Sequence, residues 1–87
     1  MTPRDILAWN VRKLRVRREL SQERLALEAG LERVSISQLE RKQVNLGIDS
    51  LGKIAEALEC EIWELLVHPK SGEEEPANLR RGRKSEA

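Results

Sequence analysis

Residues 21–41 read SQERLALEAGLERVSISQLER, a pattern of two short helices joined by a tight turn at Gly30. Glycine suits the end of the first helix because it adopts the left-handed backbone conformation without a steric penalty. In the second helix, expected over residues 33–42, Ile36 and Leu39 fall on one side and are expected to be buried. The stretch therefore predicts two packed helices, of which the second turns a polar face to solvent.

Helical spacing continues on both sides of this stretch, and no segment of the sequence reads as a strand. Apolar residues recur at helical intervals in residues 7–14, in residues 51–58 and in a short last segment, residues 62–66. We therefore expect an all-α domain of five helices over residues 1–68. A disordered charged tail is expected over residues 69–87, because its few apolar side chains cannot offset the entropy of folding.

The net charge of +1 is distributed unevenly along the chain. Residues 1–43 carry a charge of +4, residues 44–68 a charge of −4 and residues 69–87 a charge of +1. Such asymmetry suggests a basic face turned towards an anion and an acidic face turned away from it. The alternative is that solvated helices simply differ in charge.

Several classes of protein are disfavoured by the composition. No run approaches the ~20 apolar residues of a membrane span. The single Cys60 allows no disulfide within the chain, fits a cytoplasmic protein and is expected to pack as a small apolar side chain. No nucleophile–base pair or metal-ligand cluster is visible, and His68 stands alone, so we expect neither an enzyme nor a metal or cofactor site.

The outward face of the second helix in the opening stretch carries the side chains that suit base recognition. Gln can pair with adenine, Arg can pair with guanine, and Val can contact the methyl group of thymine. Such a stripe alone is more often an ordinary solvated face. The preceding helix and the turn at Gly30 favour a helix that enters the major groove of double-stranded DNA. The residues on this face are Val34, Ser37, Gln38 and Arg41, with Arg33 beside them.

Residues at the two ends of this pair of helices are candidates for contacts to the DNA backbone. Gln22 lies in a first helical turn, where free backbone N–H groups attract a phosphate. Lys42, Gln43 and Asn45 follow the second helix and either hold the other side of the backbone or form only a polar loop. The predicted backbone contacts are Gln22, Ser35, Arg41, Lys42, Gln43 and Asn45.

Together with IDSLGKIAEALECEIWELL over residues 48–66, these motifs resemble the Cro/cI-type, or Xre-family, helix-turn-helix regulators. The resemblance covers about residues 7–66 and implies a lambda-repressor-like bundle. It also implies a transcription regulator, a repressor or controller protein, that binds a pseudo-palindromic operator as a homodimer. In such proteins the position of Gln22 grips the backbone and the positions of Arg33, Val34, Ser37 and Gln38 read bases. Ser35 would be a phosphate neighbour or partly buried.

The resemblance further implies a structural ion pair between Arg15 and Glu40. Three positions depart from the family pattern. Glu32 stands where Ser or Thr usually caps the helix, and Glu is a poor cap. Lys42 stands where Gly is common, and Leu46-Gly47 replaces a frequent Pro-Ser. These departures concern one helix start and the following loop, not the fold.

Two further features leave alternatives open. Ile62, Trp63 and Leu66 could form a dimer surface, or Trp63 could instead complete the core. The basic motif of residues 80–84 could attract phosphates or could be only a solvated tail. Trp9 is expected on the partly exposed side of its helix.

A different class of function also fits the sequence. The chain could be an interaction module, such as an antitoxin-like or adaptor protein, whose main partner is another protein. That partner would engage the acidic second half or the tail.

Overall fold

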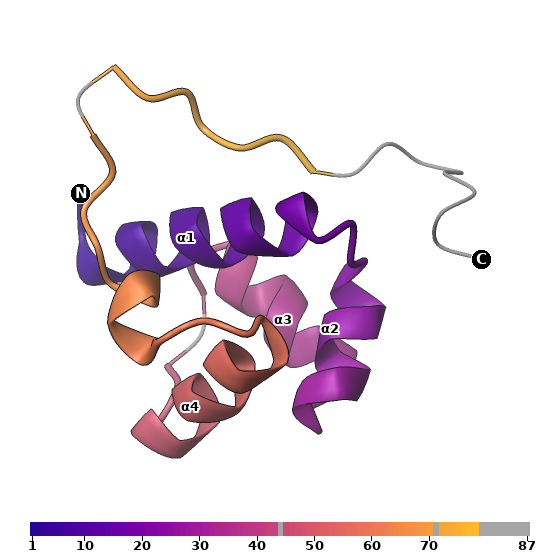
Figure 1. Cartoon of the computed structure of the whole chain (residues 1–87). Helices are drawn as coiled ribbons and strands as arrows, with labels where there is room; N and C mark the ends of the chain where they lie inside the picture. Colours follow the sequence, from indigo (N-terminus) through magenta and orange to yellow (C-terminus); the bar gives the residue numbers. More distant parts are fainter. Residues whose placement is uncertain (44, 71, 79–87) are drawn as a thin grey trace.

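The computed structural model describes residues 1–43, 45–70 and 72–78. Within these ranges the chain forms helices and no strand, which agrees with the predicted all-α class (Figure 1). The last of the five predicted helices is a single 3₁₀ turn rather than an α-helix. The elements are α1 (Pro3–Arg17), α2 (Gln22–Ala29), α3 (Arg33–Glu40), α4 (Ile48–Ala57) and the 3₁₀ helix η1 (Ile62–Leu65).

The helices enclose one apolar core. In Figure 1, α1 lies across one side of the bundle, and α2, α3 and α4 lie below it. The small side chains of Ala26 and Ala29 are buried, and they allow α2 and α3 to approach closely. The other large contributions come from fully or almost fully buried residues on every element: Val11, Leu25, Ile36, Leu39, Ile54, Leu58 and Leu65.

The helix starts show where the local sequence is strong and where it is weak. Thr2 caps α1, and its hydroxyl accepts a hydrogen bond from the Asp5 backbone N–H at 3.1 Å. Ser21 caps α2 as predicted, with its hydroxyl 2.9 Å from the Arg24 backbone nitrogen. Glu32 precedes α3 and makes no side-chain cap hydrogen bond. The start of α3 is therefore held by tertiary packing and not by its own cap.

Each α-helix of the described part is followed, within one or two residues of its end, by a residue with a left-handed backbone. The next residue then donates its N–H to a carbonyl five residues earlier, for example Leu31 to Ala26 at 2.8 Å. The sequence predicted that this helix continues to Lys42. The left-handed backbone of Lys42 explains why α3 stops at Glu40 instead. The four left-handed residues are Glu19 (φ 57°), Gly30 (φ 71°), Lys42 (φ 64°) and Glu59 (φ 57°).

Glu59→Gly is expected to raise the free energy of unfolding by about 0.5–1 kcal/mol. A left-handed conformation costs a non-glycine residue roughly 1–2 kcal/mol, part of which the greater freedom of glycine in the unfolded chain offsets. The substitution also removes the exposed ion pair between Arg18 and Glu59, 3.2 Å apart, which contributes little to the free energy of unfolding. Urea denaturation measures the change. Glu56→Gly, on the exposed face of α4, is the control and should destabilise the fold by roughly 1 kcal/mol. Equal losses in both variants would refute the prediction.

The described part of the tail lies alongside α1 without forming a helix or strand (Figure 1). A carboxylate oxygen of Glu73 lies 2.6 Å from Lys13 Nζ. The side-chain oxygen of Asn78 accepts a hydrogen bond from Arg15 Nη2. The sequence did not anticipate these contacts. The disorder predicted for the tail and the domain boundary at residue 68 stay predictions, and the basic motif at residues 80–84 lies outside the described residues.

Candidate nucleic-acid interface

The turn between α2 and α3 fixes how α3 is presented. Gly30 donates its backbone N–H to the Leu27 carbonyl at 3.2 Å, and Leu31 donates to the Ala26 carbonyl. On the inner side of α3, Ile36 and Leu39 have exposures of 0% and 1%. Because both ends of this inner face are buried, the opposite face of α3 must point to solvent.

That outward face holds the residues predicted to read bases. Arg33 and Val34 are exposed, and Ser37 and Gln38 are half-buried one turn further on. The Val34 side chain keeps 49% of its surface exposed although it is apolar. An exposed valine between polar neighbours suits contact with a thymine methyl group. Ser35 is half-buried beside this face.

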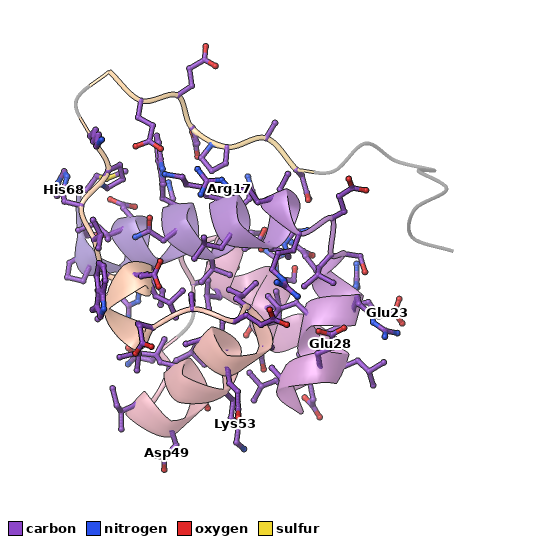
Figure 2. The ribbon with its side chains drawn as sticks, viewed as in Figure 1. Arg17, Glu23, Glu28, Asp49, Lys53 and His68 are labelled. Atoms are coloured by element: carbon purple, nitrogen blue, oxygen red, sulfur yellow. The ribbon has the colours of Figure 1, made fainter. Side chains whose placement is uncertain are left out.

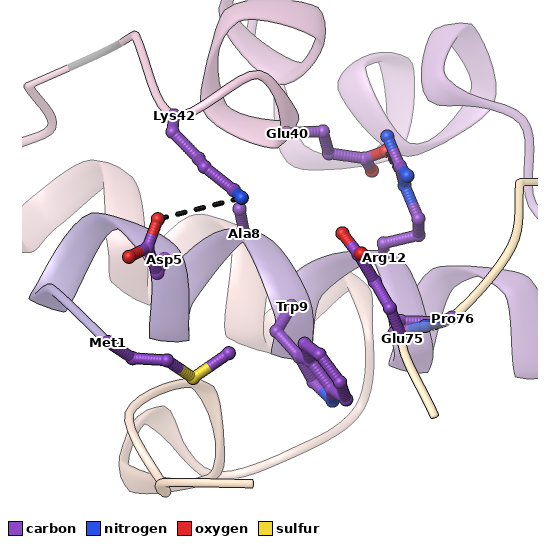
Figure 3. Close-up of a pocket in the computed structure, with 9 residues that line it drawn as sticks. All are labelled: Met1, Asp5, Ala8, Trp9, Arg12, Glu40, Lys42, Glu75 and Pro76. Carbon is purple, nitrogen blue, oxygen red and sulfur yellow. Dashed lines mark hydrogen bonds and ion pairs between the residues drawn. The ribbon is translucent and has the colours of Figure 1, made fainter. Parts of the chain in front are cut away.

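Four of the six predicted backbone contacts gather where α3 leads into the next loop. Arg41, Lys42, Gln43 and Asn45 are all exposed there. Lys42 Nζ lies 3.6 Å from a carboxylate oxygen of Asp5 (Figure 3). The N-terminal end of α1 therefore borders this loop.

One basic residue at this edge was not predicted from the sequence. Arg4 donates from Nη2 to the side-chain oxygen of Asn45 at 3.1 Å. The two residues are 41 positions apart, so no local pattern could have paired them. The contact adds a guanidinium group to the loop that follows α3.

A buried charge cluster joins α1, α2 and α3 behind this surface. The Glu40 side chain is fully buried and that of Arg15 is 1% exposed. Arg15 Nε lies 2.6 Å from Glu40 Oε2, and Arg15 Nη2 lies 2.9 Å from Oε1. The same Oε1 accepts from Arg12 Nε at 3.0 Å and from Gln22 Nε2 at 3.1 Å. The ion pair implied by the resemblance is thus part of a four-residue cluster.

The cluster gives Gln22 a structural role. Its half-buried side chain donates to Glu40 and so ties the first turn of α2 to the end of α3. Its role at a DNA phosphate stays a prediction. Burial raises the pKa of Glu40, but the hydrogen bonds and charge of Arg15, with hydrogen bonds from Arg12 and Gln22, outweigh that effect. The pKa of Glu40 therefore lies below its ordinary value.

A pocket opens between α1, the end of α3 and the tail (Figure 3). Trp9 forms part of its lining and is half-buried, as expected, with an indole nitrogen that is buried and without a hydrogen-bond partner among the described residues. Four of the five charged side chains that line it pair with one another, Lys42 with Asp5 and Arg12 with Glu40, and the fifth is Glu75. The pocket therefore offers little unpaired charge that would select a ligand.

The apolar surface predicted around Trp63 is present on the folded chain. Trp63 is 62% exposed, so it does not complete the core. Leu66 and Val67 are 50% and 45% exposed, whereas Ile62 is half-buried against the core. Asn10 fixes this segment on α1 by donating to the carbonyls of Leu65 at 3.0 Å and Val67 at 2.8 Å. Val67 was not anticipated as part of this surface.

The remaining sequence candidates take peripheral places. Cys60 is half-buried against the core, and burial, followed by the charges of Glu64 and Glu61, raises the pKa of its thiol. Figure 2 shows His68 at the outside of the molecule. Asp49 and Arg17 lie on opposite sides of the molecule. Within the described ranges, no helix is long and apolar enough to span a membrane, and no cluster of three metal-binding side chains occurs.

A helix-turn-helix family model matches residues 11–65 of the chain. Control protein C.SmaI of Serratia marcescens is 42% identical over 67 residues, which cover 77% of this chain and 80% of that protein. A hypothetical transcription factor of Neisseria meningitidis is 40% identical over 67 residues, or 77% of this chain. The matched part of the chain spans 63% of the length of that relative.

Solved structures also resemble the chain. The hypothetical transcription factor NHTF of Neisseria superposes with a TM-score of 0.76 at 40% identity, covering 78% of each chain. The restriction-modification controller protein C.AhdI of Aeromonas hydrophila gives a TM-score of 0.69 at 37% identity. That superposition covers 71% of this chain and 94% of C.AhdI.

Proposed function

The chain belongs to the helix-turn-helix (HTH_3) family, and we propose that it is a sequence-specific, DNA-binding transcription regulator. The resemblance drawn from the sequence is thereby confirmed at the level of the family. The similar proteins carry the names of transcription factors and control proteins, not of enzymes, which agrees with the prediction that the chain is no enzyme.

The observation that carries the proposal is the presentation of α3. Its eight residues span roughly 12 Å at 1.5 Å per residue, close to the ~12 Å width of the major groove. Its inner face is locked by buried Ile36 and Leu39, and its outer face offers Arg33, Val34, Ser37 and Gln38. A rigid helix with this polar face supports direct readout of base edges.

The proposal extends to a controller protein that binds its operator as a homodimer. Two relatives are named as control proteins. Two structural neighbours, C.AhdI and C.Esp1396I, are named as restriction-modification controller proteins. The exposed Trp63, Leu66 and Val67 offer an apolar surface that a second copy would cover. A two-fold dimer would read a pseudo-palindrome whose half-sites lie about 10 base pairs, or a multiple of that, apart.

Selection of bound sequences from a random pool of duplex DNA tests the proposal. The full chain should enrich a motif with two-fold symmetry. A variant carrying both Arg33→Ala and Gln38→Ala is the control and should lose the enrichment while retaining its fold. Recovery of no motif by the full chain would refute the regulator and favour the interaction module whose main partner is a protein.

Gln38→Ala is expected to relax the base preference at one position of each half-site by about 1–3 kcal/mol, because alanine cannot form the bidentate pair with a base edge. Binding assays against a set of singly substituted operators measure it. Gln22→Ala is the comparison and should weaken all sequences about equally, since a phosphate contact carries no sequence information. Unchanged base preferences in Gln38→Ala would show that α3 does not read the groove as proposed.

A further inference from the structure

Arg41 is held in place by two neighbours that the sequence had assigned to DNA. Arg41 Nη1 donates to the hydroxyl oxygen of Ser37, one turn earlier on α3. Its Nε donates to the Gln43 side-chain oxygen at 3.2 Å, two residues further on. Among the described residues, the remaining nitrogen, Nη2, has no partner. The exposed guanidinium is thus braced from two sides and keeps donors free for a ligand.

The position of Arg41, directly after the last residue of α3, points to a phosphate. It lies eight residues after Arg33, which corresponds to roughly 12 Å along a helix axis. That distance matches the ~12 Å width of the major groove. With the Arg33 end of α3 at the base edges, the Arg41 end reaches the groove wall, where phosphates lie. A flat guanidinium binds phosphate through two parallel hydrogen bonds.

Bracing matters because a long exposed arginine loses rotamer freedom when it binds. Acceptors that already fix the guanidinium remove part of that loss before DNA arrives. The hydroxyl oxygen of Ser37 uses one of its two lone pairs to accept from Arg41, and its side chain is half-buried, so it presents less hydrogen-bonding surface to a base. In both its hydrogen bond to Arg41 and its burial, Ser37 differs from Arg33 and Val34, which are exposed.

We propose that Ser37 and Gln43 are positioning residues that hold the Arg41 guanidinium towards a DNA phosphate, and that Ser37 is not a base reader. This inference rests on the proposed DNA-binding function. It revises the predicted role of Ser37 and gives Gln43 an indirect role through Arg41. Base readout then falls to Arg33, Val34 and Gln38.

Binding over a salt series to the selected operator and to an unrelated duplex of equal length tests the proposal. Ser37→Ala should weaken both complexes by the same factor, about threefold to tenfold, the net contribution of one ordinary hydrogen bond, with base preferences unchanged. Arg41→Ala should lower the slope of log K against log salt by about 0.9 for each phosphate that Arg41 neutralises. The double variant should bind no more weakly than Arg41→Ala alone.

Three controls separate positioning from other effects. Ser37→Thr keeps a hydroxyl and should retain wild-type affinity. Arg17→Ala removes an exposed charge on α1 and should leave the affinities for operator and unrelated duplex close to those of the wild type. Urea denaturation should show that Ser37→Ala remains folded.

Two outcomes would overturn the inference. One is a changed base preference in Ser37→Ala with an unchanged salt slope, and the other is full additivity of the affinity losses in Ser37→Ala and Arg41→Ala. A wild-type chain that selects no motif would instead refute the proposed sequence-specific function. The salt series on the unrelated duplex would still report on the bracing of Arg41.

Discussion

Glu40→Ala is expected to lower the free energy of unfolding by about 3–5 kcal/mol, because it leaves the buried charge of Arg15 without its partner. The Arg15 side chain is 1% exposed, so water cannot replace the two hydrogen bonds that Glu40 accepts from it. Arg12 and Gln22 lose the same acceptor. Since small domains are stable by only about 5–15 kcal/mol, the variant should be close to unfolding at about 37 °C.

Urea and thermal denaturation measure this loss, and an exposed pair supplies the control. Glu28 lies 3.0 Å from Arg24 one turn earlier on α2, with 34% and 60% of their side chains exposed. Glu28→Ala should therefore cost at most about 0.5 kcal/mol. A loss in Glu40→Ala no larger than in Glu28→Ala would show that the buried cluster does not stabilise the fold.

The same cluster predicts a dependence of stability on pH. The pKa of Glu40 in the folded chain lies below its ordinary value of 4.5. A lowered pKa means that the carboxylate stabilises the fold above that ordinary value and that this contribution is lost as pH falls through the folded pKa. Acidification below about pH 4.5 should destabilise the wild type more than Glu40→Gln. Asp5 and Glu73, whose pKa values are also lowered, remain in both proteins, so the difference isolates Glu40.

Trp63→Glu is expected to prevent dimerisation and to weaken operator binding by a factor of about 10²–10⁴. A dimer binds the two half-sites of one operator together, so its second contact is intramolecular and strengthens the complex. Separate monomers bind each half-site independently and lose this gain. Trp63 is 62% exposed, so the charge should be tolerated by the folded monomer but not in an apolar interface. Affinity for a single isolated half-site should be unchanged.

Sedimentation and titration with full operator and half-site DNA measure these two effects. Leu27→Glu is the matched control, because Leu27 is 67% exposed on α2 outside the proposed interface. It should leave the oligomeric state unaltered. A Trp63→Glu variant that remains dimeric, or a monomer that binds the full operator as tightly as the wild type, would contradict the proposed interface.

Much of the fold follows from local patterns in the sequence. The Ser21 hydroxyl cap and the left-handed Gly30 were predicted, and each depends on residues within about one turn of it. Burial of Ile36 and Leu39 followed from helical spacing, which fixes the face of a helix without reference to its neighbours. The outward placement of the residues predicted to read bases is a consequence of the same periodicity.

Other features required the three-dimensional packing. The left-handed Lys42, which ends α3 early, has a side chain that gives no local signal for this conformation. Trp63 carries the same apolar side chain whether it lies in a core or on a surface, and only the fold places it outside. Ser37 and Arg41 lie one helical turn apart, but the rotamer that makes their hydrogen bond is not encoded by spacing.

The sequence by itself therefore determined the all-α class, the pair of helices around Gly30 and the residues of the outward face of α3. Tertiary structure alone decided that Arg12 and Gln22 join Arg15 on Glu40, that Arg4 reaches Asn45, and that the tail lies along α1. The physical reason is range. Periodicity and turn chemistry act within a few residues, whereas these partners lie 18 to 60 positions apart and meet only because the core sets how the helices cross.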